Sequence, residues 1–168
     1  MPSESTRATS AAEAGFRIAA PNARPRATKV VALDRPSAAV IGRLARSPRA
    51  NTSFLTIPTG APAGDGAFSV SGWLRDLAGR AKDLADEIAG SDQVVMVATA
   101  GENAEAASII GEACSVRRIT TTGLILAGSS TPDDALSRTL LHMRPWALML
   151  VVASGDEYIE DMLTALRA

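Results

Sequence analysis

The sequence predicts an α/β fold: a three-layer domain in which a five-stranded, mainly parallel sheet carries helices on both faces. Three observations predict it. Short apolar runs recur at intervals of roughly 25–40 residues, and they are continuous rather than alternating, as in strands buried on both faces. Each run is followed by small or polar residues and then by a helical pattern. Such an alternation of strand and helix implies parallel strands joined by right-handed crossovers.

The predicted strands share a core of aliphatic residues bounded by Gly, Pro, Ser, Thr or Asp. They cover residues 30–33, 54–57, 94–98, 123–127 and 147–152. Because parallel strands run in the same direction, their carboxyl ends lie together at one edge of the sheet.

The predicted helices follow from apolar periodicity and from residues typical of helix ends. The longest covers residues 72–89, with an apolar stripe opposite a charged face, and a small-residue helix covers 103–114. Another begins at Thr131 and Pro132 and ends before Pro145. The last begins at Ser154. We expect each helix to pack its apolar side on the sheet.

Residues 1–28 differ in composition from the rest of the chain. Four arginines, at positions 7, 17, 24 and 26, lie among Ala, Ser, Thr and Pro. This composition buries too little apolar surface to offset the entropy of ordering. We therefore predict a disordered basic tail over residues 1–28, either a plain flexible segment or a docking arm, and one Rossmann-like domain over residues 29–168.

Composition excludes several classes of function. The 17 basic and 18 acidic residues nearly balance, so nucleic acid is not an expected partner. The single Cys114 and the single His142 exclude an internal disulfide and a structural zinc site, and neither residue lies near the predicted ligand edge. No stretch is apolar enough to span a membrane, and no secretory signal is evident, so a cytoplasmic location is expected.

Candidate ligand-binding residues lie in the loops that follow the strands. In an open parallel sheet the ligand crevice lies outside the carboxyl ends of the strands, where the strand order reverses. Since sequence does not fix this order, all five loops contribute candidates. They are Asp34, Ser37, Thr59, Gly60, Thr99, Gly101, Glu102, Asn103, Ser129, Ser130 and Ser154.

The loops lack the features of a phosphate cradle. The first contains no glycine and places Pro36 beside the Asp34 carboxylate, and the third offers Gly101 followed by Glu102. Acids at helix starts have an ordinary explanation, because they complement the helix dipole. They also suit a site for a cation, an amine or a hydroxylated ligand. The glycine-rich and proline-rich loop over residues 58–67 is either a lid or a plain surface connection.

The middle of the chain resembles the nucleotide-binding half of the FtsZ/tubulin family. The resemblance lies in residues 90–101, in the small-residue helix that ends at Cys114, and in the next strand, residues 121–126; overall it covers residues 28–130. It implies a Rossmann-like fold and a tendency to self-associate. The family's phosphate loop is a run of glycines and threonines, whereas Glu102 follows Gly101 here. The second domain that supplies catalytic acids is also expected to be absent, so GTP hydrolysis does not carry over.

Taken together, the sequence predicts a non-catalytic protein that acts through protein contacts, as a partner-binding or self-assembling subunit with a degenerate nucleotide site. The alternative is a small-molecule-binding or nucleotide-binding domain, or an enzyme, that uses the loops at the carboxyl ends of the strands. No catalytic residue, metal ligand or definite cofactor is assigned, although a nucleotide fits the fold. A protein partner or a second copy is the expected binding partner.

Overall fold

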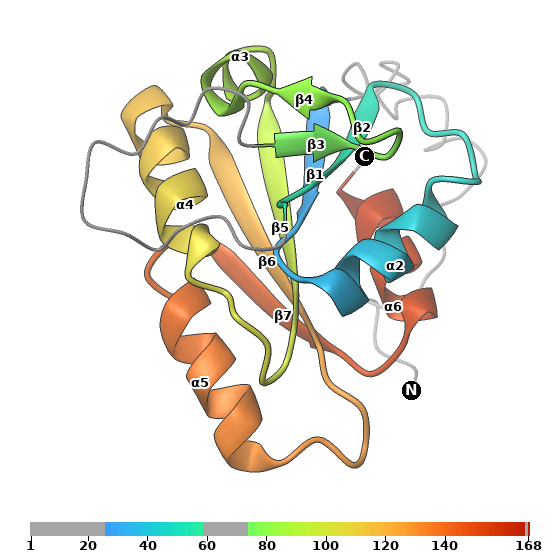
Figure 1. The fold of residues 1–168 in the computed structure, drawn as a ribbon, viewed down its shortest axis with the longest axis vertical. Coiled ribbons are helices and arrows are strands. Elements are labelled where there is room, and N and C mark those ends of the chain that lie inside the picture. Colours follow the sequence, from blue (N-terminus) through green and yellow to red (C-terminus); the bar gives the residue numbers. More distant parts are fainter. Residues whose placement is uncertain (1–25, 59–73, 167) are drawn as a thin grey trace, which may run out of the picture.

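The computed structural model describes residues 26–58, 74–166 and 168 of the chain. Figure 1 shows a central sheet with helices on both faces, which confirms the α/β class and the mainly parallel sheet. The five predicted strands are all present and parallel: β1 (Thr28–Ala32), β2 (Thr52–Thr56), β5 (Gln93–Thr99), β6 (Thr120–Leu126) and β7 (Met149–Ala153). β1 starts one residue before the predicted domain boundary, and residues 1–25 of the predicted tail lie outside the described residues.

The sheet has seven strands in its described part, not five. Two short antiparallel strands, β3 (Leu74–Asp76) and β4 (Ala81–Lys82), extend it beyond β2 and give the order β4-β3-β2-β1-β5-β6-β7. The predicted helix over residues 72–89 is therefore wrong for residues 74–82. Among the described residues of this range, only the last part is helical, as α3 (Leu84–Ala89).

Local hydrogen bonds explain why this segment turns instead of continuing as a helix. The Asp76 carboxylate accepts from the backbone N–H groups of Ala78 and Arg80, at 3.0 and 2.9 Å. Gly79 adopts a positive φ of 79°, which glycine tolerates better than any other residue. Asp83 then caps α3 by accepting from the N–H of Ala85. A side chain that accepts from the backbone N–H groups of the following residues therefore turns the chain, despite the helical periodicity of the segment.

The helices form the two outer layers. α2 (Arg35–Leu44) and α6 (Asp156–Ala165) cover one face, and α3, α4 (Ala106–Arg117) and α5 (Asp133–Met143) cover the other (Figure 1). Three helix starts differ slightly from prediction, since α4 begins at Ala106, and Pro132 and Gly155 are the cap residues of α5 and α6. None of the helices in the described part of the chain is long and apolar enough to cross a membrane.

The core lies on both sides of the central strands. On β5, Val94 and Met96 pack under α3 and α4, whereas Val95 and Val97 pack under α2 and α6. Every residue from Gln93 to Ala98 is buried, as a continuous apolar run predicts. β7 differs, because its outer side has no neighbouring strand in the described sheet and two of its five residues are exposed.

Candidate functional site

The strand order identifies the switch point, which the sequence alone could not locate. From β1 the chain crosses to β2 on one side, and from β5 it crosses to β6 and β7 on the other. The order therefore reverses between β1 and β5, and the loops after these two strands flank the switch point. Numbered by sequence, the parallel strands follow the doubly wound order 2-1-3-4-5.

Asp34 is the central residue of the switch point. It is the cap residue of α2, and its Oδ1 accepts from the Ser37 N–H at 2.7 Å. The Ser37 hydroxyl in turn accepts from the Asp34 N–H at 3.2 Å, which completes a reciprocal capping box. Ser37 is fully buried, so this pairing fixes the position of the carboxylate.

The same carboxylate binds across the switch point to the end of β5. The Thr99 N–H donates to Asp34 Oδ2 at 2.6 Å, and the Thr99 hydroxyl donates to Oδ1 at 2.9 Å. Asp34, Ser37 and Thr99, all predicted from sequence as candidates, thus form one hydrogen-bonded cluster. Pro36 contributes no N–H to this loop. The cluster joins the two loops and engages the N–H groups of Ser37 and Thr99.

The loop between β5 and α4 forms its own hydrogen bonds. The Gly101 N–H donates to the Thr139 hydroxyl on α5 at 2.9 Å, and Gly101 adopts a positive φ of 90°. Asn103 Oδ1 accepts from the Glu105 N–H at 2.9 Å, whereas the Glu102 side chain is exposed. Thr139 is buried and was missed by sequence reasoning. The sequence feature that could have indicated Thr139 is a hydroxyl at an inward position of an amphipathic helix.

The remaining candidates are not part of the cluster. Ser129 and Ser130 are exposed in the loop after β6, and Ser154 is exposed after β7. All three lie at the predicted edge of the sheet, but no hydrogen bond joins them to Asp34. Thr59 and Gly60 lie outside the described residues.

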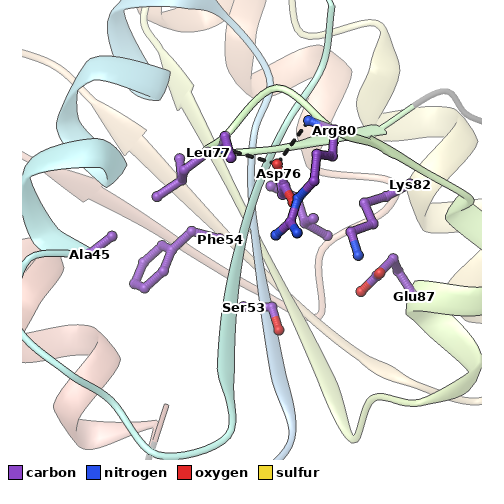
Figure 2. A pocket seen from close by; sticks show the side chains of 10 residues that line it. Ala45, Ser53, Phe54, Asp76, Leu77, Arg80, Lys82 and Glu87 are labelled. Carbon is purple, nitrogen blue, oxygen red and sulfur yellow. Dashed lines mark hydrogen bonds and ion pairs between the residues drawn. The ribbon is translucent and has the colours of Figure 1, made fainter.

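A separate cavity of about 460 Å³ lies beside β2 and the β3–β4 hairpin. Figure 2 shows Phe54 and Leu77 on one side of it and Lys82 and Glu87 on the other. Three of its four charged lining residues form ion pairs. Lys29 binds Glu87 at 2.8 Å, and Arg80 binds Asp76 at 2.7 Å. Sequence reasoning missed this cavity because it predicted a helix where the hairpin forms.

Hydrogen bonds in the hairpin also change the acidity of Asp76. The backbone N–H of Arg80 lowers the pKa of this carboxyl, with further lowering by the Arg80 side chain and the Ala78 N–H. Asp76 is therefore held as a carboxylate that organises the turn. It contributes no proton donor to the cavity.

The two residues with common catalytic chemistry lie elsewhere. Cys114 is buried in α4, and burial raises the pKa of its thiol to about 11, so it is neutral at physiological pH. His142 is exposed in the last turn of α5, at the opposite end of that helix from the loop after β6. In the described residues, no three His, Cys, Asp or Glu side chains are grouped to hold a metal ion.

Comparisons with known proteins give no assignment. No family model and no curated protein matches this chain. Among solved structures it is similar to translation elongation factor SelB from Methanococcus maripaludis in its apo form. The identity is 9%, the TM-score is 0.43, and the match covers 82% of this chain but 36% of that protein. A similarity of this degree carries no argument about function, and the resemblance to the FtsZ/tubulin family stays a prediction.

Proposed function

We propose that this protein is a non-catalytic α/β domain that acts through contacts with other proteins, and that its switch point is a degenerate nucleotide site. The observation that carries the proposal is the Asp34 carboxylate. It accepts hydrogen bonds from Ser37 N–H, Thr99 N–H and the Thr99 hydroxyl. The protein's own anion therefore takes up donors that would serve a bound phosphate.

Electrostatics and hydrogen bonding both oppose phosphate binding here. A phosphate at this position would have to displace Asp34 from charge-assisted hydrogen bonds worth about 1.5–3 kcal/mol each. It would then lie beside the displaced carboxylate and near the exposed Glu102. Repulsion between like charges adds to the loss. These terms favour a switch point that is closed by the protein itself.

Catalysis finds equally little support in the described residues. The Thr99 hydroxyl donates to Asp34, but no histidine accompanies this pair, and the Cys114 thiol is neutral and buried. Nucleophilic catalysis requires an activated nucleophile together with an oriented base. The structure of the switch point is better explained as a link between two loops.

A thermal-shift screen of the full chain with GTP, ATP, NAD and FMN tests the proposal. We expect no rise in Tm with any of them. A ligand present at 100 times its Kd stabilises the folded state by about 2.7 kcal/mol, which raises Tm by several degrees in a domain of this size. Saturable stabilisation by one of these nucleotides at micromolar affinity would contradict the proposal.

A second candidate function is the binding of a small molecule, and the cavity beside β2 favours it. Its volume of about 460 Å³ lies within the range of ordinary ligand sites, and it combines Phe54 and Leu77 with several charged groups. A ligand of this site would raise Tm in the wild type and lose that effect in Lys82→Gln. The exposed Arg138→Gln on α5 is the control.

A further inference from the structure

The two edges of the sheet are built differently. One edge is β4, which has two residues, includes Lys82 and is followed by Asp83. Short, charged edge strands resist pairing with other strands. The other edge is β7, a five-residue strand that pairs with β6 on one side and with no described strand on the other. Alternate residues of such a strand direct their N–H and C=O groups away from the sheet.

The β7 edge is apolar over its whole length. The sequence from Pro145 to Ala153 contains no charged residue. Leu148, Met149 and Val152 are 82%, 38% and 46% exposed, and Leu141 on the neighbouring α5 is 76% exposed. Exposed edges without charges are typical of strands that pair with another chain.

We propose that β7 pairs antiparallel with β7 of a second copy, which joins two sheets across a two-fold axis. This inference deepens the proposed function and rests on it, because it names the second copy as a partner. With the axis at Val151, Leu150 of one copy lies opposite Val152 of the other, and Met149 lies opposite Ala153. Every cross-strand pair within Met149–Ala153 is then apolar, so β7 is complementary to itself.

Charge on α5 favours a second copy over an unrelated strand. Leu150 packs in the same core cluster as Met143, so β7 residues of this parity face the α5 side. A two-fold axis at β7 places the two α5 helices antiparallel on that face. Each α5 begins with Asp133 and Asp134 and is followed by Arg144, so the acidic start of one copy lies toward the basic end of the other.

Two of the four acidic residues of α6, on the opposite face, form ion pairs with α2 and its following loop. Arg43 binds Asp156, with its Nε donating at 2.9 Å, and Arg49 lies 3.7 Å from a Glu160 carboxylate oxygen. Figure 1 shows α6 beside α2. Two acids of α6 are therefore neutralised within one copy, which reduces repulsion between the two α6 helices in the pair.

Sedimentation velocity of the full chain over a range of concentrations tests this inference. We expect the wild type to form a dimer and Leu148→Lys to weaken dimerisation at least about tenfold, because each copy would place a charge beside the end of the other copy's apolar β7. Val116→Lys is the matched control, since Val116 is 77% exposed and lies on α4, the helix that joins β5 to β6. Asp133→Arg should also weaken the dimer, and adding Arg144→Asp should restore it.

The outcomes separate this inference from the proposed function. A wild type that stays monomeric at every concentration overturns the β7 pairing. A dimer that Leu148→Lys leaves unchanged overturns it as well, because association must then use another surface. Neither result bears on the switch point. Nucleotide binding in the thermal-shift screen would overturn the proposed function whatever the oligomeric state.

Discussion

Asp34 links helix formation to the geometry of the switch point at the residue scale. Its carboxylate caps α2 through Ser37 and holds the end of β5 through Thr99. One side chain therefore fixes the start of a helix and joins it to the neighbouring strand. Because the same carboxylate holds both loops, we expect a change in one loop to affect the other.

Replacing Asp34 should destabilise the fold. Asp34→Ala removes three hydrogen bonds and leaves the Ser37 and Thr99 N–H groups without their acceptor, which we expect to cost about 2–3 kcal/mol. Asp34→Asn should cost less, because one oxygen still accepts. Urea denaturation measures both. The exposed Asp161→Ala on α6 is the control and should change stability by less than about 0.5 kcal/mol.

A loss from Asp34→Ala that is no larger than the control's would mean that the carboxylate is not held as the structure shows. In that case the donors of the two loops would be free for another anion.

Cys114 should make stability depend on pH in the alkaline range. Burial raises the pKa of its thiol from 9.0 to about 11. Between these values the unfolded chain releases the proton while the folded protein keeps it, so the stability of the wild type falls as pH rises through this window. Below 9.0 this contribution is fully present.

The measurement is the difference in unfolding free energy between the wild type and Cys114→Ala, taken on both sides of the window. We expect this difference to shrink as pH rises, since only the wild type loses the contribution. A difference that is independent of pH would show that the thiol titrates normally in the folded state.

The segment from Leu74 to Ala89 shows, at the element scale, what sequence could and could not predict. Its apolar and charged residues recur with helical spacing, yet the Asp76 carboxylate binds the N–H groups of Ala78 and Arg80 and turns the chain. Periodicity reports which side is apolar, but it does not report this competition for backbone donors. The cap at Asp83 was the local signal that a shorter helix begins there.

The parallel strands were predictable because their signal is local. The run from Val94 to Ala98 is apolar throughout and is buried throughout. The strand order was not predictable, since it depends on pairings such as Lys29 with Val94, between residues far apart in the chain. The sequence could therefore place the candidate site in the loops that follow the strands. It could not identify the loops after β1 and β5 as the two that flank the switch point.

Two glycines in helices should respond in opposite ways to the same substitution. A Cβ at Gly111 on α4 would lie 2.8 Å from Trp146 Cγ, so Gly111→Ala should destabilise by about 1–3 kcal/mol. A Cβ at Gly42 on α2 would meet nothing within 4 Å, so Gly42→Ala should stabilise by about 0.5–1 kcal/mol. Thermal or urea unfolding gives both signs. Equal effects at the two sites would contradict the close packing of Trp146 on α4.

The sheet offers two contrasting regions at the scale of the whole molecule. At the carboxyl ends of β1 and β5, polar groups bind one another and close the switch point. At β7, backbone groups and apolar side chains are exposed. This distribution supports the proposal that the domain binds protein surfaces rather than a phosphate. The proposed function therefore depends most on the claim that the switch point is closed.

The most direct test of that claim is an NMR titration of the ¹⁵N-labelled full chain with GTP, ATP, NAD and FMN, following the amides of Ser37, Thr99 and Gly101. We expect these three signals to stay in place at every ligand concentration, because their N–H groups already donate to Asp34 and Thr139. Saturable shifts of these amides at micromolar ligand would contradict it.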